Sequence, residues 1–173
     1  DCVSRTFDRV DADGCMSTND TVLILANGAS GVPADDTFSE GLHAVCADLA
    51  RQLAADAEGA SKLIDVRVVG AASVSDAEVA ARAVARSALF KCAMFGEDPN
   101  WGRVLSAVGT TDAEFDPLHI DVAINGVMVC QDSGPGAPRD TVDLSAREVE
   151  VVIDLHAGQE SVTIVTTDLT TDY

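Results

Sequence analysis

The sequence predicts an α+β fold, because its helical and strand patterns are grouped along the chain instead of alternating regularly. One strand, two helix-forming stretches and a strand between them fill the first part of the chain, and strand patterns dominate from residue 120 onward. The chain has 173 residues, of which 47% are hydrophobic. We therefore expect residues 1–173 to form a single domain around one core.

The N-terminal part of the chain is expected to contain the end of a helix, a buried strand and an amphipathic helix. Residues 1–9 have the pattern of a helix end, and residues 21–26 are a continuous apolar run closed by Asn27-Gly28, which is typical of a buried strand. From about Asp36 to Asp56, apolar residues recur at three- and four-residue spacing. They predict a helix with one apolar face, made of Phe38, Leu42, Val45, Cys46, Leu49 and Leu53.

The middle of the chain predicts a strand followed by helices. Residues 63–70 alternate enough for a half-buried strand. The sequence Ser75-Asp76-Ala77-Glu78 matches a capping box and predicts a long alanine-rich helix that ends near Lys91. Residues 95–103 contain the chain's only tryptophan and are rich in turn-forming residues, so they predict a rigid, partly buried turn before a helical stretch over 104–108.

The C-terminal part predicts β structure. Asn125-Gly126 lies between the alternating runs 120–124 and 127–130, and this is the strongest short-range signal for a β-hairpin. A loop is expected over residues 134–138. Two further strands follow, and their residues are 149–155 and 161–166.

Composition excludes several classes of partner. The 29 acidic and 11 basic residues give a net charge of −18, which repels nucleic acids and anionic membranes, and no apolar run reaches the roughly 18–20 residues of a membrane span. Five cysteines without a C-x-x-C pair favour free, largely buried thiols in a reducing compartment, so a cytoplasmic location is expected. The three histidines lack the spacing of metal ligands, and no common nucleotide-binding motif or nucleophile elbow is present, so no metal or cofactor is expected.

Two polar features are candidates for function. Ser17, Thr18, Asn19 and Asp20 lead into the predicted strand, where their side chains either bond to nearby backbone, the favoured reading, or line a pocket. Glu58 lies just past the end of a predicted helix, where a carboxylate opposes the helix dipole. Its chemistry leaves a surface role and a functional role open.

Taken in order, the motifs of this chain resemble those of the ornithine acetyltransferase family, the bifunctional glutamate N-acetyltransferases of arginine biosynthesis. The resemblance covers essentially the whole chain, and several motifs in the correct order make it specific. The matching segments are Phe7–Val10, Asp13-Gly14, Ser17–Leu23, Ala26–Gly28, Asp56–Gly59, Gly96–Val104 and Thr167–Leu169.

The resemblance implies an α/β sandwich like that of the self-cleaving ornithine acetyltransferases and DmpA-like aminopeptidases. Such enzymes cut their own precursor before a threonine, which becomes the nucleophile at the start of the β chain. They pass acetyl from N-acetylornithine to glutamate through an acyl-enzyme, and some accept acetyl-CoA. This chain is then most of a β chain without its nucleophile segment and C-terminal tail. The catalytic threonine is expected upstream of Asp1, no residue of this chain is catalytic, and the chain alone is expected to be inactive.

By the same resemblance Glu58 is the substrate-binding residue, and Ser17–Asp20, Asn100, Trp101 and Arg103 are site-adjacent or structural. The expected partner is the α chain of the same precursor, in an α2β2 heterotetramer that binds N-acetylornithine and glutamate. Two alternatives stay open: a related self-cleaving amidohydrolase or aminopeptidase, and a non-catalytic assembly subunit.

Overall fold

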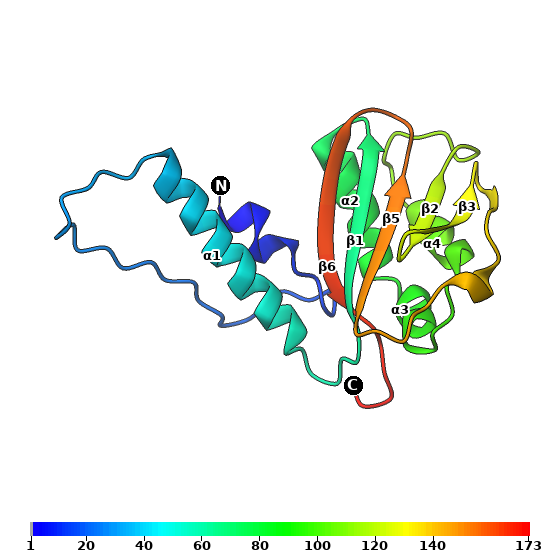
Figure 1. Cartoon of the computed structure of the whole chain (residues 1–173), viewed down its shortest axis with the longest axis horizontal. Coiled ribbons are helices and arrows are strands. Elements are labelled where there is room, and N and C mark those ends of the chain that lie inside the picture. Colours follow the sequence, from blue (N-terminus) through cyan, green and yellow to red (C-terminus); the bar gives the residue numbers. More distant parts are fainter. Residues whose placement is uncertain (1) are drawn as a thin grey trace.

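The computed structural model describes residues 2–173, which form a six-stranded mixed sheet and four α-helices (Figure 1). The strand order is β4-β3-β2-β5-β1-β6, and β1 is parallel to β5 but antiparallel to β6. The strands are β1 (Leu63–Ala71), β2 (Asp121–Ile124), β3 (Val127–Gln131), β4 (Gly134–Pro135), β5 (Glu148–Asp154) and β6 (Glu160–Thr167). The helices are α1 (Asp36–Ala55), α2 (Val74–Ala85), α3 (Ala88–Phe95) and α4 (Trp101–Val108), with 3-10 turns at Val3–Arg5, Phe7–Arg9 and Arg139–Thr141. The predicted α+β class is confirmed.

The core lies between one face of the sheet and the helices α2, α3 and α4 (Figure 1). Val66 of β1 is opposite Val151 in β5 and Ile164 in β6, and all three are fully buried. Residues on the other face of β1 and β6, such as Arg67 and Thr163, are exposed. Among residues 2–173 the sheet therefore has helices on one face only.

The predicted hairpin at Asn125-Gly126 is confirmed. Both residues have positive φ, 47° and 80°, as a two-residue type I′ turn requires. The Asn125 side chain also fixes the turn, since its Oδ1 accepts from the Glu150 backbone N–H at 2.9 Å and its Nδ2 donates to the Asp143 carbonyl at 2.8 Å.

The single helix predicted over residues 75–91 is wrong, because this segment contains two helices with a break between them. The cap of α2 is Ser73, two residues earlier than predicted, and its hydroxyl accepts from the Asp76 N–H at 3.1 Å. Ser87 starts α3 in the same way, with its hydroxyl 3.3 Å from the Phe90 nitrogen. A serine side chain that binds the backbone two or three residues ahead favours a new helix start over continuation of the old one.

The predicted buried strand over residues 21–26 is also wrong for this chain. These residues form no strand and are exposed, with Leu25 93% exposed and Leu23 77% exposed. A strand needs a neighbour for its backbone groups. Within the described part of the chain, the only β-pairing on the free edge of β6 is the single bridge between Val10 and Val165. The helix end predicted at residues 1–9 is two short 3-10 turns over the part that the structure describes.

Helix α1 has the predicted bounds within one residue, and Asp35 caps it by accepting from the Phe38 N–H at 2.9 Å. It lies beside the β6 edge of the sheet rather than over either face (Figure 1). Much of its predicted apolar face is therefore exposed, including Phe38, Val45, Leu49 and Leu53. The residues that it buries are mostly small: Cys46, Ala50 and Ala54.

Candidate functional site

Glu58 lies in the connection between α1 and β1, residues 56–62, which we call the Glu58 loop. Asp56 caps the end of α1, and the Ala60 N–H donates to the Ala57 carbonyl at 3.2 Å to close a turn with Gly59 at φ 67°. The Glu58 side chain is exposed and forms no hydrogen bond or ion pair with any residue from 2 to 173. A carboxylate without an internal partner can receive a cationic group of a ligand.

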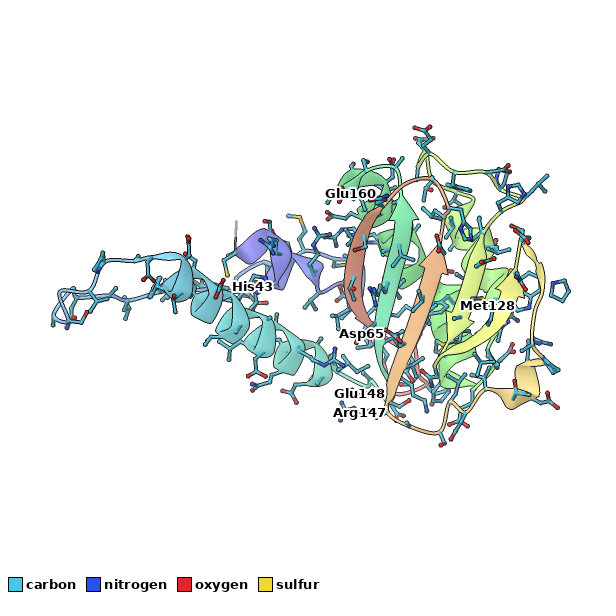
Figure 2. The ribbon with its side chains drawn as sticks, turned by 45° about the horizontal axis from the view of Figure 1, so that its top comes forward. His43, Asp65, Met128, Arg147, Glu148 and Glu160 are labelled. Carbon is cyan, nitrogen blue, oxygen red and sulfur yellow. The ribbon has the colours of Figure 1, made fainter. Side chains whose placement is uncertain are left out.

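Three contacts hold the Glu58 loop. The Asp168 carboxylate accepts from the backbone N–H groups of Ser61 and Lys62, both at 2.9 Å. The Thr170 hydroxyl donates to the Gly59 carbonyl at 2.6 Å. Arg147 donates to the Ala55 carbonyl at the end of α1, and Figure 2 shows Arg147 at this end of the sheet. The loop and the helix end before it are thus held by residues 168–170 and by Arg147.

Residues 95–103, which we call the Trp101 turn, lead from the last residue of α3 into the first turn of α4, which begins at Trp101. Asn100 caps this helix, because its Oδ1 accepts from the Arg103 N–H at 3.3 Å while its Nδ2 donates to Asp98 at 2.9 Å. The Arg103 guanidinium donates to the Leu89 carbonyl at 2.6 Å, and half-buried Trp101 packs against the core. These side chains hold the turn in place.

An open groove of about 460 Å³ lies beside the Trp101 turn. Glu58 does not line this groove, so the groove and the unpaired carboxylate are separate features. The lining residues are Asn100, Trp101, Gly102, Val129, Pro135, Gly136, Ala137, Pro138 and Arg139.

The chain's two lysines are both buried, at 6% exposure each, and sequence reasoning missed them. Lys62 Nζ forms an ion pair with Glu97 at 3.2 Å, which connects the Glu58 loop with the Trp101 turn. Lys91 Nζ donates to the Ala12 carbonyl and to the hydroxyl of Thr167 at 3.4 Å, and burial lowers the pKa of Lys91. A signal was present, because only two of 11 basic residues are lysines and arginine serves the surface.

Asp168 was also missed as a site residue, although it stands in the segment Thr167–Leu169 that supports the resemblance. Asp168 is buried, at 4% exposure, and its side chain binds Ser61, which lies 107 positions earlier in the sequence. No local pattern reveals such a contact.

The polar residues 17–20 lie apart from the other candidates. All four are exposed, and the Ser17 hydroxyl accepts from the backbone of Asn19 at 3.3 Å and of Asp20 at 2.9 Å. Thr18 bonds only to Asn19 in the described chain. This bonding is local, and no described contact joins these residues to Glu58 or to the Trp101 turn.

The cysteines are only partly as predicted. All five are free, but Cys15 and Cys92 are exposed and only Cys46 and Cys130 are buried. Among residues 2–173 no group of acidic, histidine or cysteine side chains is arranged to hold a metal ion. No helix in the same range is long and apolar enough to cross a membrane.

Comparison with known proteins matches the ArgJ family model to residues 1–173. The "Arginine biosynthesis bifunctional protein ArgJ" of Thermobifida fusca is 62% identical over 169 residues, which are 97% of this chain and 44% of that protein. The protein of the same name from Streptomyces coelicolor is 60% identical over the same shares. The chain therefore spans less than half the length of these curated relatives.

A crystal structure of the arginine biosynthesis bifunctional protein argJ from Bacillus halodurans has a similar fold. Its TM-score is 0.92 at 36% sequence identity, and the match covers 99% of this chain and 86% of that one. The match therefore extends over nearly the whole of this chain.

Proposed function

The chain belongs to the ArgJ family, and we propose that it is the larger part of the β chain of an acetyltransferase that moves acetyl from N-acetylornithine to glutamate. The family match over the full sequence supports the proposal. The activity belongs to the whole protein, because the chain spans 44% of the length of these relatives.

The proposed reaction has two halves and needs a threonine nucleophile outside these 173 residues. The threonine oxygen attacks the acetyl carbonyl of N-acetylornithine, the C–N bond breaks, and ornithine leaves with a proton. The glutamate amine then attacks the acetyl ester, which releases N-acetylglutamate and restores the hydroxyl. Acetyl-CoA is a further donor to test, and the proposal requires no cofactor or metal.

The observation that carries this chain's role is the unpaired carboxylate of Glu58 in a loop held at several points. N-acetylornithine has a free ammonium group on its side chain, which is the partner that such a carboxylate attracts. Because the loop is anchored, the carboxylate is placed before substrate arrives and less ordering is needed on binding.

We further propose that the α chain of the same precursor covers the apolar surface around residues 21–26 and α1, within an α2β2 heterotetramer. The support is the exposure of Leu23, Ile24 and Leu25 together with that of the outer face of α1. Exposed apolar residues in such number are typical of an interface, and residues 21–26 have the composition of a strand. The cytoplasm is the location that suits a biosynthetic acetyltransferase of this family.

The test uses the whole processed protein. Incubation with N-acetylornithine should add the mass of one acetyl group to the chain that begins with the threonine, and glutamate should remove it as N-acetylglutamate. Failure to form either product would refute the proposal. Release of free acetate without dependence on glutamate would favour the amidohydrolase alternative. These 173 residues alone should transfer no acetyl.

A further inference from the structure

Asp168 is bonded to the loop that carries Glu58, the proposed substrate-binding residue. Its Oδ1 accepts two backbone N–H groups, those of Ser61 and Lys62, each at 2.9 Å. Its Oδ2 accepts the Ser61 hydroxyl. Asp168 is only 4% exposed, and its buried carboxylate accepts three hydrogen bonds. These bonds fix the backbone where the Glu58 loop enters β1.

The chain that follows Asp168 continues along the same loop. Thr170 donates to the Gly59 carbonyl at 2.6 Å, and a Cβ atom on Gly59 would stand 2.9 Å from the backbone nitrogen of Tyr173. Residues 168–173 therefore lie against the residue that follows Glu58. The contact is so close that only glycine fits, independently of the positive φ that Gly59 also has.

The alternative anchors are weaker. The bond from Arg147 to Ala55 holds the end of α1 but comes before Glu58, and the single Thr170 bond leaves the residues after Gly59 free to rotate. Among residues 2–173, only Asp168 binds two consecutive backbone N–H groups on the C-terminal side of the loop. A peptide segment fixed at two adjacent amides cannot swing as a hinge.

We propose that Asp168 is a positioning residue for substrate binding, which acts by holding Glu58 where it meets the substrate's ammonium group. The inference rests on the proposed function, because it takes Glu58 as the residue whose carboxylate binds the substrate. Asp168 itself faces the backbone and does not touch substrate. Its loss should let the Glu58 loop move, and a displacement of about 1 Å is enough to weaken a charge-paired contact severely.

The test compares variants of the whole processed protein. Asp168→Ala should raise the KM for N-acetylornithine by roughly 10-fold or more while kcat changes much less, because the lost contact serves binding in the ground state and the transition state alike. Asp168→Asn keeps an oxygen for the two N–H groups and should restore most of the affinity. Asp112→Asn, an exposed residue beyond α4, is the matched control and should leave KM unchanged.

The decisive comparison is a double-mutant cycle with Glu58→Gln. If Asp168 acts through Glu58, Asp168→Ala should raise KM little further in the Glu58→Gln background, and amide hydrogen exchange should become faster over residues 56–62. Equal effects of Asp168→Ala in both backgrounds, or an unchanged KM, would overturn the inference. If Asp168→Ala does not fold, the cycle is carried out with Ser61→Ala, which removes one of the three bonds to the Asp168 carboxylate and should raise KM by a smaller factor in the wild-type background only. A wild-type protein without acetyl transfer would end the proposed function and this inference together, and that result is visible before any variant is made.

Discussion

Lys62 Nζ lies 3.2 Å from Oε1 of Glu97, and this ion pair joins the Glu58 loop to the Trp101 turn. The Lys62 side chain is only 7% exposed, and its Nζ also donates to two carbonyls in the segment 144–146. One buried ammonium group thus connects three segments that are far apart in the sequence. The turn with the chain's only tryptophan is therefore part of the framework behind the proposed substrate residue.

Replacing Lys62 by methionine should lower the free energy of unfolding by about 1–3 kcal/mol, because the buried Leu144 carbonyl and the partly buried Ala146 carbonyl lose their donor. Glu97→Gln is the control, and its effect should stay below about 1 kcal/mol because the Glu97 side chain is 54% exposed. Urea titration followed by circular dichroism measures both. Equal losses for the two variants would show that the exposed ion pair, rather than the carbonyl contacts, carries the stabilisation.

Gly59→Ala should destabilise the protein by more than Gly126→Ala does. Both glycines have positive φ, 67° and 80°, so each alanine meets a conformational penalty of about 1–2 kcal/mol. Only Gly59 would also bring its Cβ to 2.9 Å from a backbone atom, whereas Gly126 has open space around it. Thermal unfolding of the two variants measures the difference, and identical shifts would mean that residues 170–173 yield easily.

The stabilising effect of His156 should depend on pH. The hydrogen bond to Asp121 is the main cause that raises the pKa of His156 above 6.5, and Asp154 and Asp132 add to it. Because the folded-state pKa is the higher one, the contribution is complete below the ordinary pKa and is lost as the pH rises through the raised value. His156→Gln should therefore be less stable than the wild type at about pH 5.5 and should approach it at about pH 8.5. Equal differences in urea midpoints at both pH values would contradict this assignment.

Ile24→Asp should impair assembly of the whole protein, because a charge would be placed in the apolar run that we expect the α chain to cover. Val32→Asp is the matched control, since Val32 is also exposed, at 73%, but lies outside the run. Size-exclusion chromatography with light scattering should show loss of the heterotetramer for Ile24→Asp only. A normal heterotetramer with Ile24→Asp would remove residues 21–26 from the interface.

The sequence predicted well those elements whose signals are local. The hairpin at Asn125-Gly126 depends on two residues that tolerate positive φ, and α1 depends on periodic apolar residues with an Asp cap. The prediction of one helix over residues 75–91 was wrong because Ser87 caps a second helix inside an alanine-rich stretch. The energies of capping and of helix propensity are both small, so the sequence alone does not show which of them prevails.

The missed features need contacts between distant segments. Apolar residues at 21–26 have strand composition, but whether a strand forms depends on a neighbouring strand, and none is adjacent within residues 2–173. The role of Asp168 depends on its approach to Ser61, 107 positions away. Glu58 could be singled out from its unfavourable place at a helix end. The contacts of Asp168 and Thr170 that hold its loop become visible only in three dimensions.

Steady-state kinetics of Glu58→Gln in the whole processed protein test the central claim most directly. Glu160→Gln is the control, because Glu160 is also exposed and lies at the opposite end of the sheet from Arg147 (Figure 2). We expect Glu58→Gln to lower kcat/KM for N-acetylornithine by about 10-fold or more, as loss of a charge-assisted contact of about 1.5–3 kcal/mol implies, with no change in unfolding temperature and no effect of Glu160→Gln. Wild-type kinetics in a folded Glu58→Gln protein would contradict the account and return Glu58 to the surface.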